Sequence, residues 1–488
     1  MRRWISVLCA YTALAGFNLT YAQSTLTLND CRSLALENSK QIHITQEKMK
    51  AAKYSRKAAF TTYLPSVSAT GTYFRNQKEM SILNKDQKSE INKFAPLTKD
   101  RIYELADIIG EELPGAKQLI QNLGDDAYTE LTKFSDALLD GVRTDTRNIF
   151  GGGITLTQPL YAGGKIRAYN RITKYAEELA RQAHNSQMED VILSVDQAYW
   201  QVVSLVNKEK LASAYLELLS KLDQDIQHLI DEGMATKADG LAIKVKVNEA
   251  EMNLTKVKDG LTLSRMLLCQ VCGMDLHQPI NLADEQVDDL PTAAIYTDFD
   301  LAQAYEKRPE VKSLTLATQI YDQKTRLTRS EYLPKVALLG NYLVTNPSFF
   351  NGFENKFRGM FNVGIAVQIP VWNWGQGVYK TKAARAEAQV ARLQLDDAKE
   401  KIELQINQSA FKVNEASKRL VMATKNMDKA NENLSYATYG FQEGVIPVNN
   451  VLEAHTAWLS AQADKIDAQI EIKLTEIYFK KALGTLIE

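Results

Sequence analysis

The sequence predicts an α+β membrane protein, in which long helical hairpins are joined to four membrane-crossing β-strands and the whole arrangement occurs twice in one chain. Three observations predict this class: a repeat at constant spacing, short segments that alternate polar and apolar residues, and very long helical segments. Together they favour a channel over an enzyme.

The repeat relates the two halves of the chain at one fixed spacing. Pro159 recurs as Pro370 and Gly233 as Gly444, so each pair is separated by 211 positions (370 − 159 = 211; 444 − 233 = 211). The same spacing links Phe150 with Phe361, Gly153 with Gly364, Ile154 with Ile365, Gly164 with Gly375 and Gly273 with Gly484. Because one inserted residue would rotate the packing face of a helix, a gapless repeat indicates packed helices.

The first 22 residues have the pattern of a secretory signal peptide. Basic Arg2 and Arg3 precede an apolar run over 4–17, and small Ala22 marks the cleavage position. The apolar run is too short for a membrane-spanning helix. Removing two arginines changes the net charge from −1 to −3 (−1 − 2 = −3), and this near-neutral balance gives no sign of nucleic-acid binding.

The first repeat, residues 23–279, combines strands with unusually long helices. Hydroxyl residues alternate with small or apolar residues over 66–73, which is typical of a strand with one wet face and one apolar face. The segment 165–229 has neither proline nor glycine, so a helix roughly 100 Å long is expected, and it needs partner helices. The predicted elements are a helix over 26–62, strands over 66–75 and 150–158, a long helix over 165–229 and a return helix over 238–271.

The second repeat, residues 298–488, follows the same plan after a linker over 280–297. Its predicted elements are a helix over 298–331, strands over 335–344 and 361–369, a long helix over 376–440 and a return helix over 450–483. In the strand over 335–344, Leu339 and Leu343 fall on the expected polar face. Six residues mark the predicted strand–helix junctions: Pro65, Pro159, Gly164, Pro334, Pro370 and Gly375.

The halves differ by one insertion. Pro65 and Phe150 are 85 positions apart, whereas Pro334 and Phe361 are 27 apart, so the first repeat has 58 extra residues between its strands (85 − 27 = 58). Residues 98–140 look helical and amphipathic, with Pro96, Pro114 and Gly124 as expected breaks. Because outer-membrane barrels place long excursions outside the cell, the segment 76–148 is expected to be extracellular. It is either a variable surface loop or a lid or docking cap.

Four strands cannot close a barrel by themselves, and open strand edges are not tolerated in lipid. The chain is therefore expected to oligomerise, and three copies would supply twelve strands.

The cysteines and histidines give no sign of a cofactor. Cys269 and Cys272 lie on one face of a predicted helix, and packing in a helical seam is the favoured interpretation over a redox or zinc site. The five histidines lack metal-ligand spacing, and no catalytic motif is present.

The ordered landmarks give the chain a family resemblance. Leu64-Pro65 and Leu333-Pro334 precede strands, and the segments 158–164 and 369–372 follow strands in duplicate. In these features the chain resembles the TolC-type outer membrane efflux proteins. The resemblance implies a trimer with a twelve-stranded barrel and a periplasmic α-barrel. It also implies an outer-membrane location and a periplasmic adaptor joined to an inner-membrane pump, as in tripartite efflux or type I secretion.

The same resemblance implies two sets of functional residues at the turns of the long hairpins. The tips that dock the adaptor would contain Gly233, Met234, Thr236, Gly444 and Val445. The periplasmic gate would contain Asp239, Asn450, Glu453 and Phe441. Ile446 stands where the family has a basic gate residue, and Asn450 stands where it has an acidic one, so only part of the family's polar lock is present.

A soluble periplasmic coiled-coil protein of the adaptor type, without a pore, is the alternative to the channel. It shares the helical hairpins but needs neither the four alternating segments nor the duplication.

Overall fold

The computed structural model describes residues 25–77, 83–112, 114–141, 145–286, 299–348, 350 and 354–487. The predicted signal peptide lies outside these residues. The described residues form two compact units. The helical unit comprises those within 1–57, 170–325 and 382–488, and the sheet unit comprises those within 58–169 and 326–381.

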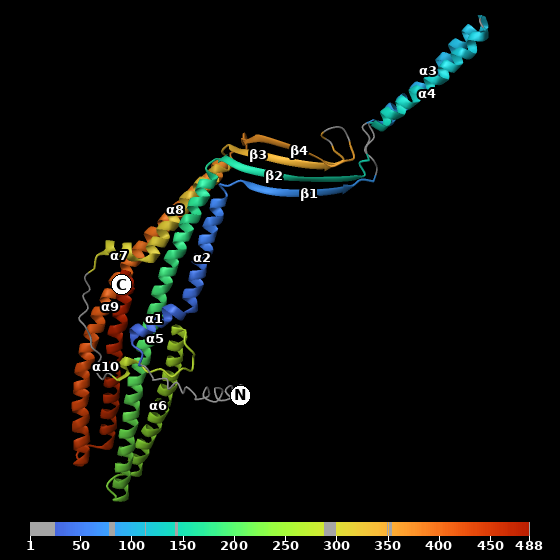
Figure 1. The fold of residues 1–488 in the computed structure, drawn as a ribbon. Helices are drawn as coiled ribbons and strands as arrows, with labels where there is room; N and C mark the ends of the chain where they lie inside the picture. Colours follow the sequence, from blue (N-terminus) through green and yellow to red (C-terminus); the bar gives the residue numbers. More distant parts are fainter. Residues whose placement is uncertain are drawn as a thin grey trace, which may run out of the picture. The chain divides into compact units, whose positions relative to one another are not determined.

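The helical elements recur at the spacing seen in the sequence (Figure 1). Helices α5 (Lys165–Asp231) and α9 (Gln376–Gln442) have 67 residues each, and α6 (Lys237–Cys272) and α10 (Val448–Leu483) have 36 each. In each pair the second helix begins 211 positions after the first (376 − 165 = 211; 448 − 237 = 211). The long helices of the two repeats thus begin and end at equivalent residues.

The helices that precede the strands are duplicated as well. In the first repeat, α1 (Leu28–Asn38) is followed by α2 (Lys40–Thr61); in the second, α7 (Leu301–Lys307) is followed by α8 (Pro309–Ser330). Helices α2 and α8 both have 22 residues and begin 269 positions apart (309 − 40 = 269), which is the repeat spacing plus the 58 inserted residues. A short 3₁₀ helix, η1 (Ala283–Gln286), lies between the repeats.

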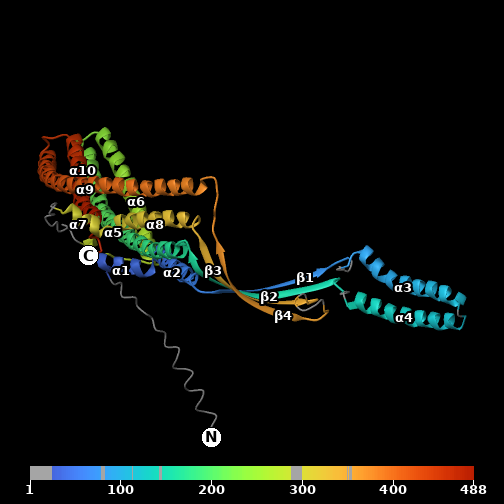
Figure 2. The ribbon, with the colours of Figure 1, turned by 90° about the horizontal axis from the view of Figure 1, so that it is seen from above.

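The sheet unit contains four antiparallel strands in sequence order: β1 (Ser66–Arg75), β2 (Asn148–Ala162), β3 (Lys335–Asn346) and β4 (Arg358–Gln368). The order leaves β1 and β4 at the two edges. Helices α3 (Lys85–Glu112) and α4 (Pro114–Gly141), inserted between β1 and β2, form an antiparallel hairpin, and Figure 2 shows the two helices side by side.

The strand register aligns most apolar residues of the four strands on one face, whereas others, among them Leu339, Leu343 and Met360, lie on the other. One row across the sheet joins Ala69, Ile154, Tyr342 and Phe361. A neighbouring row on the other face joins Ser68, Thr155, Asn341 and Asn362. The alternation of polar and apolar residues along each strand thus gives the sheet one mainly apolar face and one mainly polar face.

A partly buried ion pair joins α1 to α5 beside the core of the helical unit. The Arg32 guanidinium donates two hydrogen bonds to the Asp196 carboxylate (2.7 and 2.6 Å), and Asp196 is fully buried. Burial raises the pKa of Asp196, and the bidentate contact with Arg32 partly offsets that effect. Apolar residues from α1, α5, α6 and α10 surround the pair.

The cysteines pack in this core. Cys31, Cys269 and Cys272 are free and buried, and burial raises the pKa of the Cys269 thiol. The interpretation of Cys269 and Cys272 as packed residues of a helical seam is confirmed.

The structure differs from the sequence predictions at several breaks. The helix expected over 26–62 is interrupted at Ser39, which has an extended backbone (ψ 124°) and ends α1. Pro159 does not end its strand: β2 continues to Ala162 through a bulge between Pro159 and Tyr161. The bulge leaves Leu160 without a partner on β3, directly after a proline that has no N–H to donate, and bulges are among the few places where a sheet accepts proline. Pro96 lies within α3 and Gly124 within α4, so neither breaks the inserted helices.

Among the described helices, none combines the length and apolar composition that crossing a membrane requires.

Left-handed glycines end the duplicated hairpins, and two of them allow a matched test. Gly233 and Gly273 have φ values of 76° and 71°. A Cβ at Gly233 would meet nothing within 4 Å, whereas one at Gly273 would lie 2.8 Å from the Asn38 carbonyl oxygen. We predict that Gly233→Ala costs about 1–2 kcal/mol, the cost of a left-handed backbone alone, and that Gly273→Ala costs more.

Thermal unfolding in detergent, followed by circular dichroism, measures both substitutions. Equal losses for the two variants would show that the contact between Gly273 and Asn38 does not constrain the fold.

Candidate functional site

The turn between α5 and α6 forms one end of the candidate site. The N–H groups of Met234 and Ala235 both donate to the Leu229 carbonyl (2.8 and 3.1 Å), and Gly233 supplies the left-handed residue that this reversal needs. The Met234 side chain is 68% exposed. The turn is therefore fixed through its backbone and presents an apolar side chain to solvent.

A capping box fixes the start of α6. The Thr236 hydroxyl donates to Asp239 Oδ2 (2.6 Å), the Thr236 N–H donates to the same oxygen (3.0 Å), and the Asp239 N–H donates back to Thr236 Oγ1 (3.2 Å). The hydrogen bond from the Thr236 hydroxyl, and to a lesser extent the one from the Thr236 N–H, hold the pKa of Asp239 below its ordinary value. Asp239 thus caps its own helix.

The turn between α9 and α10 is built the same way but without a side-chain cap. The N–H groups of Val445 and Ile446 donate to the Gly440 carbonyl (2.8 and 3.1 Å), and Gly444 has a φ of 74°. Ile446 lies against Gly440, where a Cβ would come within 2.5 Å of Ile446 Cδ1. The residue at the family's basic position therefore packs within the turn, and Val445 is 80% exposed.

A cavity of about 830 Å³ lies between the two turns. Phe441 and Asp239 both line it, together with residues of all four long helices. Next to the cavity, along the helices, apolar side chains of α5, α6, α9 and α10 form a continuous core. This core includes Leu219, Ile226, Ile243, Val451 and Leu452. The structure thus brings two predicted gate residues together at one cavity.

Asn450 and Glu453 occupy a different surface. Both lie on α10, three positions apart, so they share one helix face. Both are exposed, and in the described part of the chain neither side chain forms a hydrogen bond or ion pair with another residue.

His455 was not singled out by the sequence analysis. It is 4% exposed, lines the same cavity, and its Nδ1 has no hydrogen-bond partner within the described residues. Burial lowers its pKa to about 4. The sequence signal was present, because apolar Val451, Leu452 and Ala454 put this histidine on the buried side of its helix.

The predicted junction residues lie in the sheet unit, apart from the turns. Pro65 and Pro334 each precede a strand, and Pro370 follows β4. Gly164 and Gly375 have φ values of 86° and 77° before α5 and α9. They shape the change from strand to helix.

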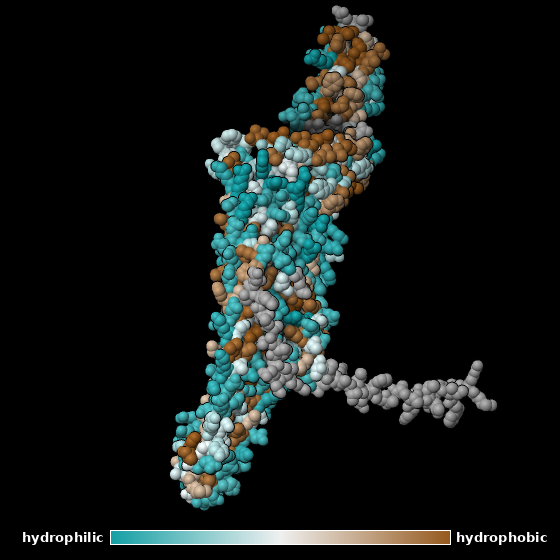
Figure 3. All heavy atoms as spheres, turned by 90° about the vertical axis from the view of Figure 1, so that its left-hand side faces the viewer, coloured by the Kyte–Doolittle hydropathy of each residue, from teal (hydrophilic) through white to brown (hydrophobic). Residues whose placement is uncertain are grey.

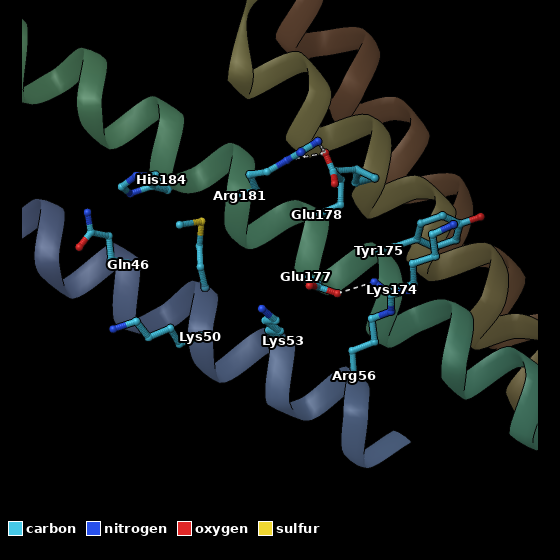
Figure 4. Close-up of a pocket in the computed structure, with 12 residues that line it drawn as sticks. Gln46, Lys50, Lys53, Arg56, Lys174, Tyr175, Glu177, Glu178, Arg181 and His184 are labelled. Carbon is cyan, nitrogen blue, oxygen red and sulfur yellow. Dashed lines mark hydrogen bonds and ion pairs between the residues drawn. The ribbon is translucent and has the colours of Figure 1, made fainter. Parts of the chain in front are cut away.

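A second cavity, of about 880 Å³, lies among α2, α5 and α8 and is lined by charged side chains (Figure 4). Arg56 pairs with Glu177 across it (2.8 Å), and Arg181 pairs with Glu178 on α5. None of the predicted gate or tip residues lines this cavity.

Comparison with known proteins identifies the family. The family model described as "Outer membrane efflux protein" matches residues 127–273 and 301–485, which include the long hairpins of both repeats. The chain belongs to the outer membrane efflux protein family.

Individual relatives agree with this assignment. The alkaline protease secretion protein AprF of Pseudomonas aeruginosa is 25% identical over 276 residues, which are 54% of this chain and 54% of AprF. The outer membrane protein TolC of Escherichia coli is 21% identical over 372 residues, 74% of this chain and 73% of TolC. The match to AprF thus spans about half of that protein's length.

Solved structures share the fold. The CmeC outer membrane channel of Campylobacter jejuni aligns with a TM-score of 0.74 at 15% identity, over 94% of this chain and 86% of CmeC. The MtrE outer membrane channel of Neisseria gonorrhoeae aligns with a TM-score of 0.68 at 13% identity, over 94% of this chain and 89% of MtrE.

These findings confirm the predicted family resemblance, the fold class and the outer-membrane location. They place this chain among the outer membrane efflux proteins. The relatives named here are secretion, outer-membrane and channel proteins, so the alternative of a soluble adaptor is not supported.

The buried histidine predicts a pH-dependent packing of the tip. Because the folded protein holds His455 neutral, its contribution to stability is present above about pH 6.5 and is lost as the pH falls from there towards 4. At pH 5 the loss reaches up to about 2 kcal/mol. After correction for the slower intrinsic exchange at low pH, we expect amides of residues 448–455 to have lower protection factors at pH 5 than at pH 7.5, and His455→Leu to remove this difference.

His228→Leu is the matched control, since His228 lines the same cavity but is exposed. If the protection of these amides depends on pH equally in wild type and His455→Leu, protonation of His455 does not destabilise the tip.

Proposed function

We propose that this efflux protein is a homotrimeric exit duct, which passes substrates of a tripartite efflux or type I secretion system from an inner-membrane pump to the exterior. A periplasmic adaptor protein joins pump and duct. The observation that carries the proposal is a four-stranded sheet with one apolar face and two open edges.

The open edges supply the reason for a trimer. Among the described residues, strands β1 and β4 each pair with only one neighbouring strand, so one row of backbone N–H and C=O groups on each is left without a strand partner. In hydrocarbon, each unpaired group costs several kcal/mol. Pairing β1 of one copy with β4 of the next removes every edge, and three copies give a closed barrel of twelve strands.

The sheet surface fits outer-membrane lipid. On β4, Phe361, Val363 and Ile365 are all more than half exposed on the apolar face. Just after β4, the exposed rings of Trp372 and Trp374 contact each other edge to face, with centroids 5.7 Å apart. Tryptophans at this position match the aromatic girdle of a membrane–water interface. Figure 3 shows apolar side chains gathered over the sheet, whereas the surface of the long helices is mainly hydrophilic.

The long hairpins supply the periplasmic part. Helices of 67 residues are roughly 100 Å long, which is more than three times the thickness of a bilayer's hydrocarbon core. The exposed Met234 and Val445 then present apolar contacts to the adaptor, while Gly233, Gly444 and the Thr236 cap fix the backbone that carries them.

The gate is proposed at the same end of the hairpins. Three copies of Glu453, with Asn450 one turn earlier, form a ring on the α10 face that each subunit leaves uncovered. Phe441 and Asp239 act within the subunit, by lining the cavity between the turns and by capping α6.

The proposal predicts that the mature protein purifies from outer membranes as a trimer that needs detergent and forms channels in planar bilayers. Light scattering corrected for bound detergent measures the mass, and bilayer recording measures the conductance. A protein that is monomeric and soluble without detergent contradicts the trimeric duct.

A ring of three carboxylates at the narrow end favours cations. We predict that Glu453→Gln lowers the cation-over-anion permeability ratio, measured from reversal potentials in a salt gradient. Asp259→Asn is the control, because Asp259 is an exposed acid on α6 away from the turns. An unchanged ratio for Glu453→Gln removes Glu453 from the gate.

A further inference from the structure

The inserted α3–α4 hairpin is held together by its own seam. The Tyr103 hydroxyl donates to Asp125 Oδ1 (2.8 Å), and Lys99 forms an ion pair with the same carboxylate (2.6 Å). Ala106 is fully buried, and Gly124 lies so close to α3 that a Cβ there would be 3.1 Å from Ile102. Along one face, therefore, α3 and α4 bury apolar residues against each other and pair their polar groups.

Each helix also has a second apolar stripe, which this seam does not cover. On α3 the stripe follows a heptad-like spacing and lies about a third of a turn from the seam. Its members are Phe94, Leu97, Leu105 and Ile108. On α4 the corresponding residues are Leu119, Leu123, Phe134 and Leu138. All but Leu138 are more than half exposed, and Figure 3 shows apolar side chains along the hairpin.

The two stripes lie on the same side of the hairpin. Each is rotated in the same sense from the seam, and because the helices are antiparallel, equal rotations bring both stripes to one face. The register that puts Tyr103 beside Asp125 and Lys117 beside Asp107 sets Leu105 within about one turn of Leu123. The result is one apolar surface two helices wide, here called the outer face.

A surface of eight large apolar side chains on one hairpin marks an interaction site. The chain connectivity points to further copies of this protein as the occupant. The hairpin joins β1, an edge strand, to β2, so in a closed trimer each copy brings one hairpin to the same end of the barrel, beside a subunit boundary.

The charges on the outer face fit this occupant. Arg101 lies within the α3 stripe and has no ion pair among the described residues. Glu130 lies within the α4 stripe, where it pairs only with Lys133 of its own helix (2.8 Å). In a three-fold ring, α3 of one copy lies beside α4 of the next, which brings these opposite charges together across the boundary.

We infer that three α3–α4 hairpins pack their outer faces around the channel axis and form a helical crown that narrows the extracellular mouth. This inference rests on the proposed trimeric duct, because the symmetry of the duct supplies the three hairpins.

Cross-linking in the full-length protein tests the crown. In Arg101→Cys with Glu130→Cys, the crown predicts covalent dimers and trimers on denaturing gels after treatment of intact outer membranes with a bifunctional maleimide. The native cysteines Cys31, Cys269 and Cys272 are buried and do not compete. The matched control is Asp100→Cys with Thr129→Cys, which puts two exposed cysteines on the opposite face of the same hairpin.

The outcomes separate this inference from the proposed function. A ladder from the outer-face pair and none from the control supports the crown. If the detergent-solubilised protein is trimeric and conducts, but the outer-face pair gives no ladder, the crown is overturned while the duct stands. Equal ladders from both pairs indicate random collision and also overturn the crown. Transfer of a photoactivatable lipid label to the outer-face cysteines would show that membrane, not protein, covers the face.

A second variant does not depend on cysteine reactivity. Leu105→Glu with Leu123→Glu places six carboxylates inside the crown of a trimer, and their repulsion is expected to separate the hairpins and raise single-channel conductance. Ser89→Glu with Asn122→Glu adds the same two carboxylates to neutral, exposed positions on the polar side and should leave conductance unchanged. Equal conductance of wild type and the Leu105→Glu, Leu123→Glu channel contradicts a crown over the pore.

Discussion

The pairing of backbone groups at the two edges of the sheet is the constraint on which the structure depends. In the described part of one chain, strands β1 and β4 lack a second neighbouring strand, and lipid offers no water to take its place. The subunit is therefore incomplete at the sheet. Closing the sheet through neighbouring copies also places the long helices of each copy under one symmetry, so the closure that satisfies the strands organises the periplasmic hairpins.

The helices impose a second constraint, which explains the regularity of the repeat. A 67-residue helix cannot gain or lose one residue without turning its packing face away from its partners. Insertions are tolerated where no such packing exists, and the 58 extra residues accordingly fall between β1 and β2. They form a hairpin with its own seam, so the insertion adds a structural element without disturbing the register of the duct.

Local patterns predicted what local physics determines. The alternation in 66–73 predicted β1, and the misplaced Leu339 does lie on the polar face, opposite Thr157. Features that depend on contacts between distant parts of the chain could not be predicted from the sequence. Pro159 looked like the end of a strand because the bulge that accommodates it depends on the register with β3. The resemblance implied a gate role for Asp239, whereas the structure shows that Asp239 caps α6. Thr236, three positions earlier, already indicated this capping box. The outer face required the pairing of α3 with α4.

Amide hydrogen exchange of the purified protein in detergent tests the closure of the sheet most directly. If copies pair through their edges, amides of β1 and β4 are protected as strongly as those of the central strands β2 and β3. Rapid exchange along the outer edges of β1 and β4, beside slow exchange in β2 and β3, would show that the sheet stays open and would contradict the account.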